Sequence, residues 1–160
     1  MTEKYFMMSR RYNKVTPEQF NLVPTETPGM YINVSDGTNW ISRYLYDFGV
    51  GPEYGFCRFP MPEFEKLLDL LLDSEDEDNR YGAAVILIQE YPEELLSECE
   101  DILKDKNSLS KYKDFFRILH LDRPLNRSSI MGKSFAQIED DFMKWKAISL
   151  EVEKVLRFKD

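Results

Sequence analysis

The feature that most limits how this chain can fold is a run of six apolar residues at 83–88. This run lies in a stretch whose pattern predicts a helix over 79–91, which Pro92 ends. A helix that is apolar on all sides must be covered by other elements over most of its surface. The chain therefore needs a packed core around this helix, and a chain of 160 residues is long enough to bury one.

Helical periodicity continues on both sides of this segment. Before it, a stripe at i, i+3, i+4 and i+7 predicts a helix that begins near Pro62, with the apolar residues Phe64, Leu67, Leu68 and Leu71. After it, Pro92 begins another helix whose first turn is acidic, as the helix dipole favours. Two more helices are predicted, one from Ser108 to about residue 121 and one behind the capping box of Ser134 and Gln137.

The first 61 residues have a different character and hold most of the prolines, five of eight. Residues 30–34 alternate apolar and polar side chains, which predicts one short strand followed by a turn at 35–38. Residues 39–48 then carry apolar side chains at helical spacing and predict a helix that ends before Gly49. The alternative is that residues 39–48 form the second strand of a hairpin.

Together these elements predict a mainly α protein, a compact helical single domain over residues 1–160. Within it we expect an irregular portion at 1–61, with at most a short β element, and a helical portion at 62–160. The segment LLDLLLDSEDEDNRYGAAVIL, residues 67–87, resembles a HEAT-like helical repeat: an apolar first helix, an Asp-containing turn, an Arg and two small residues. One such unit is recognisable, and a solenoid needs several. The resemblance therefore implies one HEAT-like helix pair inside a compact domain.

The charge balance limits the classes of partner. Lys and Arg number 21 and Asp and Glu number 29, so the formal net charge is −8. Such a charge repels nucleic acid and anionic membranes and speeds encounter with basic partners, although a negative charge also serves solubility alone. No segment has the length and apolar character of a signal peptide or a membrane span. We expect a cytoplasmic protein with no nucleic-acid or membrane partner.

The acidic turn, which we define as residues 73–78, is the strongest candidate for a site. Its five acidic residues are Asp73, Glu75, Asp76, Glu77 and Asp78. A calcium-binding EF-hand loop starting at Asp73 would need glycine at its sixth position and glutamate at its twelfth, where the chain has Asp78 and Ala84. Two interpretations stay open: a solvated turn between two helices, or an acidic surface for a basic partner.

No motif in the chain defines a reaction. The one histidine, His120, is predicted near the end of a helix, and Cys57 and Cys99 stand outside any CxxC cluster and are expected to be buried thiols. One histidine and two scattered cysteines do not suggest a zinc site. We predict that the protein is not an enzyme and has no cofactor or metal. A site assembled from distant residues, with His120 as the first suspect, is the alternative.

Aromatic residues gather in the first 60 positions. Trp40, Tyr44 and Tyr54 are accompanied by few basic side chains, which argues against single-stranded nucleic acid. Packing in the core explains them, but any that is exposed beside the acidic turn would be an anchor for a protein partner. The predicted partner-binding residues are these three aromatic residues and the five acidic ones.

In general character the chain is similar to bacterial immunity proteins, which are small and acidic and lack catalytic motifs. The residues that carry this resemblance are the HEAT-like stretch at 67–103 and the acidic turn. The resemblance implies tight inhibition of a cognate toxin, often a nuclease, by covering its basic active site. We therefore predict a toxin inhibitor, and we expect reversal of all five acidic charges to weaken binding without affecting folding.

The alternative function is a non-catalytic scaffold or regulatory subunit that forms oligomers through its C-terminal helix. The residues that would form the helical seam are Phe135, Ile138, Phe142, Trp145 and Val152. The competing interpretation is that this helix packs across the protein's own core. A monomer or a weak dimer is predicted.

Overall fold

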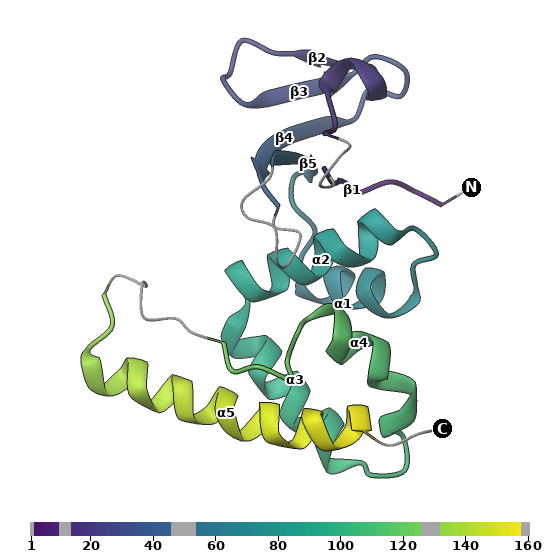
Figure 1. Cartoon of the computed structure of the whole chain (residues 1–160). Coiled ribbons are helices and arrows are strands. Elements are labelled where there is room, and N and C mark those ends of the chain that lie inside the picture. Colours follow the sequence, from purple (N-terminus) through teal and green to yellow (C-terminus); the bar gives the residue numbers. More distant parts are fainter. Residues whose placement is uncertain (1, 10–13, 46–53, 126–131, 158–160) are drawn as a thin grey trace. The chain divides into compact units, whose positions relative to one another are not determined.

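The computed structural model divides into two compact units, Met1–Tyr91 (unit 1) and Pro92–Asp160 (unit 2), which we describe separately. It describes residues 2–9, 14–45, 54–125 and 132–157 (Figure 1). The boundary between the irregular and helical portions, expected at residue 61, falls inside unit 1, because the first two long helices belong with the sheet.

Unit 1 is built on a five-stranded antiparallel sheet with the order β1-β5-β4-β3-β2. The strands are β1 (Phe6–Met7), β2 (Leu22–Pro24), β3 (Met30–Asn33), β4 (Asn39–Tyr44) and β5 (Tyr54–Phe59). The prediction of a mainly α protein with at most a short β element is therefore wrong, and the fold is α+β. All five strands lie within residues 1–61, the stretch whose turns and prolines predicted irregular structure, and only the strand at 30–33 was predicted.

The helix predicted over 39–48 is also wrong, because β4 occupies Asn39–Tyr44. The hairpin alternative is correct: Trp40 pairs with Tyr31 on β3, and on its other side with Arg58 on β5. Aromatic and β-branched residues suit a pleated surface with partners on both sides, and this outweighs their helical spacing. The end of the predicted helix, from residue 46, lies outside the described residues.

On one face of the sheet, β1 packs against α2 (Glu77–Glu90), which packs in turn against α1 (Phe64–Asp73). Phe6 of β1 is fully buried against Gly82 of α2. A Cβ atom at Gly82 would lie 2.2 Å from Cγ of Phe6, so the strand approaches α2 closely only because this residue is glycine. The residues of α2 from Gly82 to Leu87 are buried, which confirms the predicted core helix.

The opposite face of the sheet has a core of its own. Its buried members are Met7, Leu22, Trp40 and Phe56. Phe20, from the short 3-10 helix η1 (Pro17–Phe20), and Val15 cover this cluster. The sheet is thus packed on both faces, which explains why so many aromatic residues fall in the first 60 positions.

Unit 2 is helical. Its elements are α3 (Pro92–Lys104), the 3-10 helix η2 (Leu109–Tyr112), α4 (Lys113–Ile118) and α5 (Phe135–Arg157). The capping box predicted at the start of α5 is present, with Ser134 and Gln137 exchanging hydrogen bonds of 2.9 and 3.2 Å. The buried face of α5, which includes Trp145, Ile148 and Val152, packs on α3 and α4. Among the described residues, no helix has both the length and the apolar character needed to cross a membrane.

Candidate partner-binding surface

The acidic turn joins α1 to α2, and part of it is used to begin α2. Asp76 is the N-cap residue: its Oδ1 accepts a hydrogen bond of 3.0 Å from the backbone N–H of Asn79. Ser74 Oγ in turn accepts the N–H of Asp76 at 3.1 Å. An acidic N-cap satisfies an otherwise unpaired N–H group and meets the positive end of the helix dipole. This carboxylate is therefore built into the fold.

The same part of the turn holds the N-terminal segment. Lys4 Nζ donates to Oδ2 of Asp76 at 2.9 Å and to Oδ2 of Asp78 at 3.3 Å. The backbone N–H of Met8 also donates to Asp78, at 3.3 Å. Partial burial acts to raise the pKa of Asp76, but the hydrogen bonds from Lys4 and Asn79 outweigh it and hold this pKa below its ordinary value.

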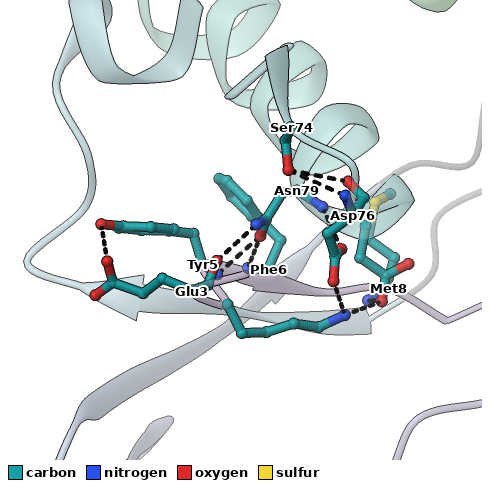
Figure 2. A network of polar contacts seen from close by, with 9 residues as sticks. Glu3, Tyr5, Phe6, Met8, Ser74, Asp76 and Asn79 are labelled. Atoms are coloured by element: carbon teal, nitrogen blue, oxygen red, sulfur yellow. Dashed lines mark hydrogen bonds and ion pairs between the residues drawn. The ribbon is translucent and has the colours of Figure 1, made fainter. Parts of the chain in front are cut away.

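Asn79 completes the attachment of β1 and was not anticipated from the sequence. Its side chain is fully buried in the first turn of α2 and reaches the backbone of the N-terminal segment (Figure 2). Oδ1 accepts the N–H groups of Tyr5 at 2.8 Å and Phe6 at 3.2 Å, and Nδ2 donates to the carbonyl of Glu3 at 2.8 Å. A buried polar group with its partners removed is costly, so these bonds tie the strand firmly to α2.

The structure divides the five acidic residues of the turn into two groups. Asp76 and Asp78 are half-buried and bonded to the N-terminal segment. Asp73, Glu75 and Glu77 are exposed. The contacts of the first group lead us to expect that reversing all five charges disturbs the fold, contrary to the expectation from sequence. Any surface function of this turn would therefore rest on Asp73, Glu75 and Glu77.

Most of the chain's net negative charge is carried by unit 1. This unit has 8 Lys and Arg against 15 Asp and Glu, a net charge of −7, whereas unit 2 has 13 against 14 and is nearly neutral. A cationic molecule approaching the protein is therefore attracted mainly by unit 1. The exposed acids of the turn lie in the unit that carries this charge.

Of the three aromatic residues predicted to bind a partner, Trp40 lies in the core. It is 1% exposed, and its indole N–H donates to Thr38 Oγ1 at 2.8 Å. The guanidinium carbon of Arg58 lies 5.7 Å from the centre of its ring. Trp40 is thus held by its own unit and does not contribute to a surface.

Tyr44 and Tyr54, which we call the tyrosine pair, are on the surface. They are directly opposite each other on β4 and β5 and are 47% and 56% exposed. Their ring centroids are 4.2 Å apart, and the Tyr54 hydroxyl donates to the Tyr44 hydroxyl at 2.6 Å. This hydrogen bond, more than any other cause, raises the pKa of Tyr54. The two rings therefore present one ordered aromatic surface with two hydroxyl groups.

The strand β4, which carries Tyr44, is hydrogen-bonded to α2. Arg43, next to Tyr44 on β4, donates to the side chains of Gln89 and Glu90, each at 2.9 Å. Because successive side chains of a strand point to opposite faces, Arg43 holds β4 from the helix side and leaves the tyrosine pair on the other. An aromatic surface on a rigid element loses little conformational entropy when it binds a partner.

The residues that could suggest catalysis are one histidine and two cysteines. His120 is exposed, has a φ of 52° and follows the end of α4, as expected for a residue near a helix terminus. Cys57 and Cys99 are buried free thiols, as predicted, and burial raises the pKa of Cys57 to about 12. Burial also raises the pKa of Cys99. Neither thiol is poised as a nucleophile at neutral pH.

Within the described ranges, no group of three or more His, Cys, Asp or Glu residues is arranged to hold a metal ion. Comparison of the chain with family models, with curated proteins and with solved structures found no match. The HEAT-like and immunity-protein resemblances therefore remain expectations, and the candidate surface stands on its geometry.

Proposed function

We propose that the chain is a protein-binding inhibitor that acts in the cytoplasm and neutralises a basic partner, in the manner of an immunity protein against a toxin domain. The observation that carries this proposal is the tyrosine pair: two exposed, stacked and hydrogen-bonded aromatic side chains on a braced sheet, in the unit that carries a charge of −7. Tyrosine is one of the residue types most enriched among the energetically dominant contacts of protein interfaces.

In this proposal the two features have separate tasks. The tyrosine pair provides affinity, because its rings bury apolar area while their hydroxyl groups remain available to hydrogen-bond donors and acceptors. Asp73, Glu75 and Glu77 attract the cationic partner before contact, which changes the association rate more than the dissociation rate. Asp76 and Asp78 only support the fold.

The test begins with capture of the partner on the purified chain at low salt, followed by measurement of the association and dissociation rates for that partner. A growth assay then checks whether the partner is toxic and whether the chain relieves the toxicity. We expect Tyr44→Ala with Tyr54→Ala to raise the dissociation rate at least tenfold, in line with the loss of two central aromatic contacts. The double variant Tyr44→Phe with Tyr54→Phe keeps the rings and removes the hydroxyl groups. Its dissociation rate shows how much the hydroxyl groups contribute to binding.

The exposed acids are tested by the triple variant Asp73→Lys, Glu75→Lys and Glu77→Lys. It should slow association several-fold and flatten its dependence on salt. The matched control reverses three exposed acids of unit 2, Glu94, Glu100 and Asp101, and so changes the net charge equally. Equal rates for both triple variants would remove the role of the acidic turn. A dissociation rate unchanged by loss of the tyrosine pair, or a partner whose activity the chain does not reduce, would overturn the proposal.

A further inference from the structure

Helix α5 has a second apolar side besides the one that packs in unit 2. Its exposed apolar residues are Phe135, Phe142, Met143 and Leu150, and Phe135 is 84% exposed. At about 100° per residue, their spacing of seven or eight places them on one side of the helix. The residues that pack on α3 and α4, among them Trp145 and Val152, lie on a different side. Of the seam predicted from the sequence, Trp145 and Val152 are thus already used within the unit. Phe135 and Phe142 instead belong to this exposed side, which we call the α5 stripe.

Two exposed charged residues lie on the same side of the helix. Glu139 stands between Phe135 and Phe142, and Lys146 stands between Met143 and Leu150. Neither forms an ion pair with another residue in the part of the chain that the structure describes. The stripe therefore reads apolar, acidic, apolar, basic, apolar along the helix.

When the order is read in the opposite direction, the acidic and basic positions exchange places. A second copy of the stripe that runs antiparallel is therefore complementary to the first. If two copies of α5 lie antiparallel with the two-fold axis between residues 142 and 143, then Glu139 of each copy meets Lys146 of the other. Phe142 and Met143 of both copies surround the axis, and each Phe135 meets the other copy's Leu150. In a parallel pair, Glu139 would meet Glu139 and Lys146 would meet Lys146, which is unfavourable. The charges thus select the antiparallel arrangement.

We propose that the α5 stripe is the interface of an antiparallel, two-fold symmetric dimer of this chain, with the register set by the Glu139–Lys146 contacts. Residues 135–150 span about 22 Å of helix at 1.5 Å per residue, which is long enough for a helix–helix interface with an apolar centre. A two-fold axis repeats each contact, so one charge substitution changes two contacts at once. The α5 stripe shares no residue with the tyrosine pair or the acidic turn. The dimer proposal therefore does not depend on whether they bind a partner.

The test is analytical ultracentrifugation of the full chain up to about 100 μM, a range in which a dimer with micromolar Kd is populated. We expect Glu139→Lys alone, and Lys146→Glu alone, to raise the dimer Kd about tenfold, because each places like charges at both symmetry-related contacts. The two substitutions together restore opposite charges, and the Kd should return to within about threefold of its original value. Phe142→Ser should abolish the dimer.

The matched control is Lys144→Glu, which reverses an exposed lysine on the same helix, outside the stripe, and should leave the Kd unchanged. All these positions are exposed, so circular dichroism should show the same fold and thermal midpoint for each variant. A chain that is monomeric over the whole range overturns the proposal. A dimer that the two charge reversals weaken additively, without restoration in the double variant, overturns the antiparallel register.

Discussion

At the scale of single residues, Asp73 and Asp76 show how position decides the role of a carboxylate. Both belong to the acidic turn, yet Asp73 is exposed and Asp76 caps α2 and contacts Lys4. The ammonium group comes from a residue 72 positions earlier in the chain. No local pattern reveals that contact, whereas the spacing of Asp76 and Asn79 is that of an ordinary N-cap.

The lowered pKa of Asp76 leads to a prediction about pH. Because this pKa is lower in the folded state, the charged form contributes stability above the unfolded pKa of about 3.9, and this contribution is lost as pH falls through the folded value. Asp76→Asn keeps a capping side chain and removes the charge. Urea unfolding should show the variant to be less stable at neutral pH, with a difference that shrinks below about pH 4. Asp73→Asn is the control, and a difference independent of pH would contradict this explanation.

At the scale of elements, the close approach of β1 to α2 depends on the missing side chain at Gly82. Glycine inside a helix is unfavourable by about 0.5–1 kcal/mol relative to alanine, so its presence in the middle of α2 calls for a packing reason. That reason is Phe6, which fills the space where a Cβ would be. A two-residue edge strand is held by packing and by Asn79 more than by its own ladder.

We predict that Gly82→Ala destabilises the protein by about 1–3 kcal/mol despite the better helix propensity of alanine, because the core is overpacked. Combining it with Phe6→Leu should recover part of the loss, with a coupling of at least about 0.5 kcal/mol in a double-mutant cycle measured by urea unfolding. Additive effects of the two substitutions would show that the clash is relieved elsewhere.

At the scale of the whole molecule, the chain forms two compact units that differ in architecture and charge. Unit 1 combines the sheet with α1 and α2 and carries the negative charge, whereas unit 2 is helical and nearly neutral. Each unit buries one tryptophan, Trp40 in the first and Trp145 in the second. Fluorescence can therefore report on each unit separately.

Asn79→Ala provides the test of this division. It leaves two backbone N–H groups and one carbonyl without their partner and should cost about 2–4 kcal/mol. In a Trp145→Phe background the Trp40 signal should shift to a clearly lower urea concentration. In a Trp40→Phe background the Trp145 signal should shift less. Equal shifts of both signals would mean that the two units unfold as one.

The helices were predictable because their signals are local. Pro92 begins α3, Ser134 and Gln137 cap α5, and an apolar stripe marks α1, all within a few residues of the element they define. The sheet was not predictable in the same way. The pairing of Trp40 with Arg58 joins residues far apart in the chain, and without those partners residues 39–44 fit a helical spacing as well as a strand.

The sequence by itself determined the helical segments from residue 62 onward, the buried thiols and the large negative charge. Periodicity and capping act over short range, and net charge is a sum over the composition. Only the tertiary structure decided the sheet, the burial of Trp40 and the exposure of the tyrosine pair. It also separated Asp76 and Asp78, bonded to the N-terminal segment, from Asp73, Glu75 and Glu77. These outcomes depend on contacts between segments distant in sequence, and the free energy of such contacts is absent from any local pattern.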